Sequence, residues 1–236
     1  MTAARTEIAA DPHELALRAA DWIAGLVAAR DGPQFRIALA GGATPRLLYG
    51  ELSLRSIDWS RMEFYWIDER FVPPDDPDSN YRMATETLLS HVPALPGNVH
   101  PIPTGGDPDA AARAYEGTLK LAYGADRLDS ARPLFDFVLL GLGADGHICS
   151  LLPGSPLLDE RERWVAPVAH GRPEVRITLT YPSVQSSRVT AFYVAGEDKA
   201  KAVKAARAGD ANLPGGRLHP EGELVWLLDR AAASLL

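Results

Sequence analysis

Two hydrophobic patterns alternate along the chain. Near the amino end, apolar residues recur at three- and four-residue intervals from Leu15 to Leu26, which predicts a helix that begins after Asp11 and ends near residues 31–33. Similar periodicity and end signals predict further helices at residues 45–54, 79–91, 108–123 and 197–207. A compact apolar run predicts a buried strand at residues 35–40, and residues 62–67, 134–140, 175–180, 189–195 and 224–228 are further predicted strands.

Strands and helices take turns along the sequence, and this order predicts the fold class. Strands separated by a helix pair in parallel through right-handed crossovers, because parallel strands need a long connection. We therefore expect a Rossmann-like, three-layer α/β/α fold with an open, mostly parallel sheet, in a single domain over residues 1–236. Such sheets bind ligands beyond the carboxyl ends of their strands, so the loops there are the expected site of chemistry.

Composition narrows the class of protein. The 236 residues are 46% hydrophobic and 23% charged, which is typical of a globular chain. A formal net charge of −7 disfavours general binding to nucleic acid or anionic membranes, so an anionic ligand needs a local basic pocket. The single cysteine, Cys149, cannot form an internal disulfide, and residues 1–14 contain no apolar signal segment. We expect a cytoplasmic location.

A glycine-rich turn between a predicted strand and a predicted helix is the first candidate site. Gly41, Gly42, Ala43 and Thr44 precede Pro45, with Thr44 as the expected N-cap. Free backbone amides at a helix amino end attract anions. The turn is therefore either a phosphate site or only a tight connection.

Two basic residues could complete a phosphate site. Lys199 lies in the first turn of the last predicted helix, where a cation opposes the helix dipole. Either Glu197 and Asp198 or a bound phosphate would compensate that charge. Arg176 is a second possible phosphate contact, or else a charge at a strand edge.

The loop after the predicted strand 134–140 carries the strongest catalytic candidate. Residues 141–146 match the dinucleotide fingerprint G-x-G-x-x-G, but Pro153 stops the long helix that this fingerprint must open, and the ribose-binding acid is missing. The loop instead presents His147, whose intrinsic pKa of about 6.5 suits proton transfer. Asp145 can orient its ring. A structural histidine is the alternative.

Three charged residues follow the predicted strand 62–67. Arg70 is a planar donor suited to an acidic sugar, and Asp68 or Glu69 can hold sugar hydroxyls. A self-neutralising surface loop is the alternative interpretation of the same three residues.

Four motifs follow one another at the ends of predicted strands: AGGATP at 40–45, WIDER at 66–70 with SNY at 79–81, LLGLGADGH at 139–147 with SLLP at 150–153, and GEDKA at 196–200. In this order they resemble the 6-phosphogluconolactonase family, which belongs to a wider fold shared with glucosamine-6-phosphate deaminase. Two positions depart from the family pattern: Ala43 stands where serine is common, and Leu152 where phenylalanine is frequent. The resemblance implies an enzyme that hydrolyses 6-phospho-D-glucono-1,5-lactone to 6-phosphogluconate, in the oxidative pentose phosphate pathway.

Roles for individual residues follow from the same resemblance. It implies that His147 activates water, that Arg70 and Lys199 bind the acidic substrate, and that Asn80, in the second motif, contributes to binding. We expect the phosphate to lie between the amides of residues 41–44, Lys199 and Arg176.

Arg70 or a loop amide near Gly143 is the expected donor to the oxyanion. Ser150 lacks the Gly-x-Ser-x-Gly elbow, which makes an acyl-enzyme the less favoured route. No cofactor or metal is expected, since no cluster of metal ligands is evident in the sequence.

Two other functions remain open from the sequence. A deaminase of this fold is expected to have a glutamate five residues after the histidine, where this chain has Leu152, and Tyr at position 70. A sugar-phosphate sensor would bind ligand without turnover. The expected partner is a small sugar-phosphate lactone, with no nucleic acid or membrane, and the chain is expected to be a monomer or weak homodimer.

Overall fold

A six-stranded parallel sheet forms the centre of the protein. The computed structural model describes residues 5–169, 171 and 173–236. The strands lie in the order β1-β9-β8-β5-β2-β3, and every neighbouring pair is parallel. Their bounds are β1 Arg5–Ala9, β2 Phe35–Leu39, β3 Met62–Trp66, β5 Phe135–Leu140, β8 Ser187–Val194 and β9 Glu223–Asp229. The predicted α/β class with an open parallel sheet is confirmed.

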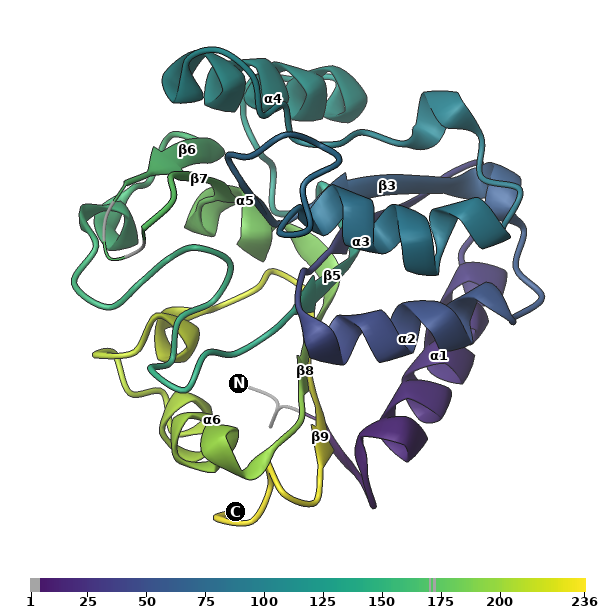
Figure 1. Ribbon diagram of the computed structural model, residues 1–236, viewed down its shortest axis with the longest axis vertical. Coiled ribbons are helices and arrows are strands. Elements are labelled where there is room, and N and C mark those ends of the chain that lie inside the picture. The colour runs from purple at the N-terminus through teal and green to yellow at the C-terminus, as the bar shows by residue number, and fades with distance from the viewer. Residues whose placement is uncertain (1–4, 170, 172) are drawn as a thin grey trace.

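Helices connect the strands and cover the sheet. The helices are α1 Pro12–Ala29, α2 Ala43–Ser53, α3 Asn80–Thr87, α4 Pro108–Tyr123, α5 Tyr181–Gln185 and α6 Ala200–Arg207. Helices α1 and α2 pack side by side on one side of the sheet, and α6 lies on the other side (Figure 1). In the described part of the chain, no helix combines the length and apolarity that crossing a membrane requires.

A second, three-stranded antiparallel sheet corrects the sequence-based prediction. It consists of β4 Asp68–Arg70, β7 Arg176–Leu179 and β6 Val165–Val168, in the order β4-β7-β6. Residues 175–180 were expected in the main sheet and residues 68–70 in a loop. The chain changes sheets at Ile67, whose amide bonds to Leu39 of the main sheet and whose carbonyl accepts from Leu179 of the small one.

The helix ends show which local signals are reliable. The Asp11 carboxylate accepts from the amides of His13 and Glu14, as expected for an N-cap. The expected Thr44 N-cap is wrong: α2 begins at Ala43, and its N-cap is Gly42 at a φ of 109°, which has no capping side chain. A positive φ favours glycine. The turn therefore depends on the conformational freedom of Gly42 and not on a capping bond from the Thr44 hydroxyl.

Two predicted helices are shorter than expected. The helix expected over 79–91 ends at Thr87, because Leu88 leaves helical geometry at a φ of −132° before a short 3₁₀ turn at Leu89–His91. The helix expected over 197–207 begins with a 3₁₀ turn, Glu197–Lys199, and becomes α-helical at Ala200. This second difference puts Lys199 at the junction of the two helices.

Candidate active site

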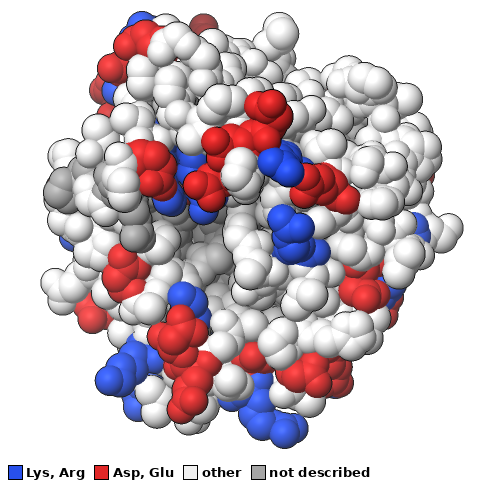
Figure 2. Space-filling model, viewed as in Figure 1, with Lys and Arg blue, Asp and Glu red and all other residues white. Residues whose placement is uncertain are grey.

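A pocket of about 270 Å³ lies beyond the carboxyl ends of β2, β5 and β8. The view in Figure 2 shows this hollow near the middle of one face, with basic and acidic side chains around its rim. These three strands are neighbours in the sheet, so the loops that follow them converge. Most of the residues expected to form a site line it, namely Gly41, Gly42, Ala43, Thr44, Asp68, Arg70, Asn80, Gly143, His147, Arg176 and Lys199.

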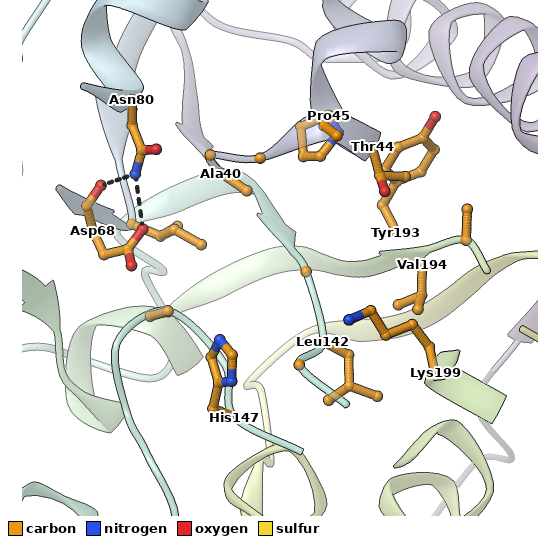
Figure 3. Close-up of a pocket in the computed structure, with 18 of the residues that line it drawn as sticks. Ala40, Thr44, Pro45, Asp68, Asn80, Leu142, His147, Tyr193, Val194 and Lys199 are labelled. Atoms are coloured by element: carbon orange, nitrogen blue, oxygen red, sulfur yellow. Dashed lines mark hydrogen bonds between the residues drawn. The ribbon is translucent and has the colours of Figure 1, made fainter. Parts of the chain in front are cut away.

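The amino end of α2 forms one wall of the pocket. Gly42, Ala43 and Thr44 line the pocket, and the first amides of a helix have no acceptor within the helix. Lys199 lies across from them, with its side chain reaching into the space between the labelled residues in Figure 3. The lysine ammonium is 3.0 Å from the carboxylate of the exposed Asp198. The helix dipole and the ammonium both attract an anion to this wall.

His147 and Asp145 form a close pair in the loop after β5. The ring Nδ1 of His147 lies 2.5 Å from Oδ1 of Asp145, which also accepts the His147 backbone amide at 3.2 Å. His147 lines the pocket, whereas Asp145 does not. The loop is closed by its own hydrogen bonds, from the Gly143 amide to the His147 carbonyl and from the Gly146 amide to the Gly143 carbonyl. The pair can therefore present an oriented imidazole to a ligand.

Gly143 leaves room for this pair. A Cβ atom at Gly143 would lie 2.0 Å from Nδ1 of His147 and 2.4 Å from Oδ1 of Asp145. The imidazole and the carboxylate thus pack directly on the glycine backbone. The Gly143 amide donates to the His147 carbonyl at 2.9 Å, so a loop amide that binds the oxyanion would have to come from a residue near Gly143.

Asp68 and Asn80 line the pocket on the side away from Lys199 (Figure 3). The side-chain amide of Asn80 donates to the backbone carbonyl of Asp68 at 3.0 Å and to the Asp68 carboxylate at 3.3 Å (Figure 3). The backbone of Gly41 packs on Asn80, since a Cβ atom there would lie 1.8 Å from the Asn80 side-chain oxygen. This contact joins the α2 turn to the second motif.

Glu69 does not line the pocket, which corrects its expected role in binding. Its side chain is buried, and its carboxylate accepts from the amides of Arg70, Asn80 and Tyr81 and from the hydroxyl of Ser79. Burial raises the pKa of Glu69, and the three backbone donors act in the opposite direction. Its oxygens hold the amino end of α3 instead of a ligand.

Arg70 and Arg176 lie directly opposite each other in the β4–β7 pair, and both line the pocket. Arg70 donates to the Asp78 carbonyl, and Nε of Arg176 donates to Glu174 at 2.9 Å. Like charges at opposite positions of an antiparallel pair repel, so an anionic ligand here would relieve part of that repulsion.

Sequence reasoning missed several pocket residues. Apolar positions contribute part of the lining, and no local signal distinguishes them from core residues: Pro45, Ile67, Leu142, Val194 and Ala195. Cys149 also lines the pocket, in a left-handed conformation with a φ of 50°. Burial raises the pKa of its thiol, which keeps the thiol protonated and poorly nucleophilic.

Fold and pocket together define an open parallel α/β protein whose ligand site lies at the carboxyl ends of its strands. Residues 10–226 match the model of the glucosamine-6-phosphate isomerases/6-phosphogluconolactonase family. The chain belongs to this family, and the resemblance found in its motifs is confirmed.

Individual relatives agree with this assignment. The chain is 41% identical over 212 residues to 6-phosphogluconolactonase 3, chloroplastic, of Arabidopsis thaliana, a match that covers 86% of this chain and 65% of that protein. It is 42% identical over 199 residues to the 6-phosphogluconolactonase of Streptomyces coelicolor, covering 80% of this chain and 76% of the relative. The structure of the 6-phosphogluconolactonase from Trypanosoma cruzi superimposes with a TM-score of 0.86 at 29% identity, over 99% of this chain and 97% of that one.

Proposed function

We propose that this protein hydrolyses 6-phospho-D-glucono-1,5-lactone to 6-phosphogluconate, the lactone-opening step of the oxidative pentose phosphate pathway. One observation carries the proposal: the His147–Asp145 pair and the anion-attracting end of α2 line or adjoin the same pocket in a member of this family. Relatives about 40% identical to the chain are named as this lactonase.

The substrate phosphate binds at the amino end of α2, where the amides of residues 41–44 and the Lys199 ammonium surround it. Arg176 lines the same pocket and adds positive charge near the sugar. Fixing the phosphate far from the reacting carbon orients the lactone carbonyl toward His147.

His147 acts as the general base in this mechanism. Asp145 fixes a proton on Nδ1, which makes Nε2 the basic nitrogen of the imidazole. The ring takes a proton from water as the water oxygen attacks C1, and it returns the proton to the ring oxygen when the C1–O bond breaks. Arg70 lines the pocket as the donor to the developing oxyanion.

Ser150 and Leu152 disfavour two other reactions in this pocket, an acyl-enzyme route and deamination. Ser150 is buried and donates its hydroxyl to Asp68 at 2.6 Å, which supports attack by water over an acyl-enzyme. Leu152, where a deaminase of this fold is expected to have glutamate, is apolar and buried, so it supplies no proton for ring opening. Both observations favour lactone hydrolysis.

The first test measures lactone loss with the wild type and His147→Ala. The lactone is made in place from glucose 6-phosphate by a dehydrogenase, and the spontaneous rate is subtracted. We expect the wild type to accelerate hydrolysis and His147→Ala to lower turnover about 10²-fold or more, the usual contribution of general acid–base catalysis. His91→Ala, at an exposed histidine outside the pocket, is the matched control and should keep full activity.

Three outcomes distinguish the candidates. No acceleration by the wild type would reject the lactonase. Equal rates for wild type and His147→Ala would leave the activity standing and reject the mechanism. Ammonia release from glucosamine 6-phosphate would favour the deaminase.

Other properties expected from the sequence stay predictions. They are a cytoplasmic location, catalysis without cofactor or metal, and a monomer or weak homodimer. In the described part of the chain, no three His, Cys, Asp or Glu side chains are grouped as a metal site would require.

A further inference from the structure

Ser150 occupies a buried turn between the catalytic loop and the small sheet. The turn is closed by a hydrogen bond from the Leu151 amide to the Ile148 carbonyl, and Ser150 is 1% exposed. Its hydroxyl donates to Oδ2 of Asp68 at 2.6 Å, across 82 residues of sequence. Ser150 thereby ties the segment that carries His147 to the strand that carries Asp68.

The serine is itself held in place by Thr178. The Ser150 amide donates to the Thr178 hydroxyl at 3.1 Å, and that hydroxyl donates to the Leu179 carbonyl at 3.0 Å. Thr178 is fully buried and lies opposite Asp68 in the β4–β7 pair. This arrangement aims the serine hydroxyl at one oxygen of the Asp68 carboxylate.

Asp68 is surrounded by neutral donors. Asn80 donates to Oδ1 and Ser150 to Oδ2, and the structure shows no ion pair between Asp68 and a Lys or Arg among the residues it describes. A carboxylate oxygen accepts about two hydrogen bonds. Each oxygen of Asp68 therefore keeps acceptor capacity, and the side chain lines the pocket.

We propose that Ser150 is a positioning residue that fixes the Asp68 carboxylate to accept a hydrogen bond from a hydroxyl of the sugar lactone. The inference rests on the proposed function. The Asp68 carboxylate repels the substrate phosphate. Contact with a neutral hydroxyl at the other end of the ligand explains why a carboxylate lines this anion-binding pocket. The pair makes the pocket selective for hydroxylated lactones over deoxy analogues, since a site built to bind a hydroxyl rejects a ligand that lacks it.

A double-mutant cycle tests whether Ser150 acts through Asp68. We expect Ser150→Ala to raise KM about tenfold, the loss of one hydrogen bond to a charged group, with a smaller change in kcat. In the Asp68→Ala background, the same serine substitution should have no further effect on KM. Ser183→Ala is the control, because the Ser183 hydroxyl is also buried and donates at 2.6 Å, to the Trp164 carbonyl away from the pocket.

Binding provides a readout that does not need turnover. Calorimetry with 6-phosphogluconate and its 2-, 3- and 4-deoxy forms should show that the wild type loses about tenfold or more in affinity for one deoxy form. Asp68→Ala and Ser150→Ala should bind that form and the parent acid with more nearly equal affinity. Thermal unfolding of each variant checks that the fold is retained.

The outcomes separate the inference from the proposed function. A wild type that neither hydrolyses the lactone nor binds 6-phosphogluconate would reject the proposed function and the inference with it. An active wild type whose Ser150→Ala and Asp68→Ala effects are additive, or one that binds all deoxy forms equally, would reject only the inference.

Discussion

At the scale of single residues, the pocket depends on positions where a side chain would not fit. Gly143 lies under the His147–Asp145 pair, and Gly41 lies against Asn80. Neither glycine has a left-handed φ, so the requirement comes from close approach and not from backbone conformation. The two glycines set how near the polar side chains come to the loops that carry them.

Gly143→Ala should therefore damage catalysis more than stability. The new methyl group would lie within 2.4 Å of His147 and Asp145, so one of the two must rotate away and the oriented imidazole is lost. We expect turnover to fall at least tenfold, toward the level of His147→Ala, in the lactone assay. Gly105→Ala, a loop glycine with open space around its Cβ position, is the control and should keep full activity. Normal turnover of Gly143→Ala would show that the pair tolerates displacement.

At the scale of elements, Glu69 organises the amino end of α3. One carboxylate accepts from three backbone amides and the Ser79 hydroxyl, and two of these amides, of Asn80 and Tyr81, are donors that the amino end of α3 leaves without helical partners. Because Asn80 is the first residue of α3, this cap also fixes the side chain that holds Asp68. A residue outside the pocket thus supports two that line it.

Glu69→Gln should destabilise the protein. Glutamine replaces one acceptor oxygen with an NH₂ group, which faces donors that no longer have a partner, at a cost of about 1–3 kcal/mol in the free energy of unfolding. Denaturant titration measures this change. The matched control is Glu86→Gln in α3, where the exposed i,i+4 pair with Arg82 should contribute little to stability. Equal small effects at both positions would contradict the capping role.

At the scale of the whole molecule, charged residues at the two ends of the strands have different roles. At the amino ends of the strands, the buried Asp136 carboxylate accepts from Nε of Arg30 at 2.7 Å and from the Arg36 amide at 2.9 Å, and lies 3.2 Å from Nε of Arg188. These contacts join the end of α1 to three neighbouring strands. At the carboxyl ends, Asp68, Arg70 and Lys199 line the pocket instead.

Asp136→Ala should lower stability and leave catalysis unchanged. Removing the carboxylate leaves the Arg36 amide without its acceptor and two guanidinium groups without their partner, which costs about 1–3 kcal/mol. We expect a lower unfolding midpoint with unchanged kcat and KM, the reverse of His147→Ala. Asp109→Ala, which breaks an exposed pair with Arg163, should cost under about 1 kcal/mol. A change in KM for Asp136→Ala would show that the two edges are coupled.

The parallel sheet, five of its six strands and the loops that carry the chemistry were predictable from the sequence, whereas the edge strand β1 was not predicted. These follow from local signals: hydrophobic period, glycine turns, and residue pairs as close as Asp145 and His147, which are two positions apart. The motifs also identified the family, because their order and spacing are written directly in the chain.

How those residues are used depends on contacts made in the folded protein. Whether Glu69 caps a helix, whether the Gly143 amide is available and whether Ser150 meets Asp68 depend on contacts between segments as far as 82 residues apart. The same applies to residues 175–180, whose strand lies in the small sheet, where the Leu179 amide donates to the carbonyl of Ile67. The sequence shows which hydrogen bonds a group can donate or accept. Which partner lies within reach depends on how distant segments pack in the folded protein.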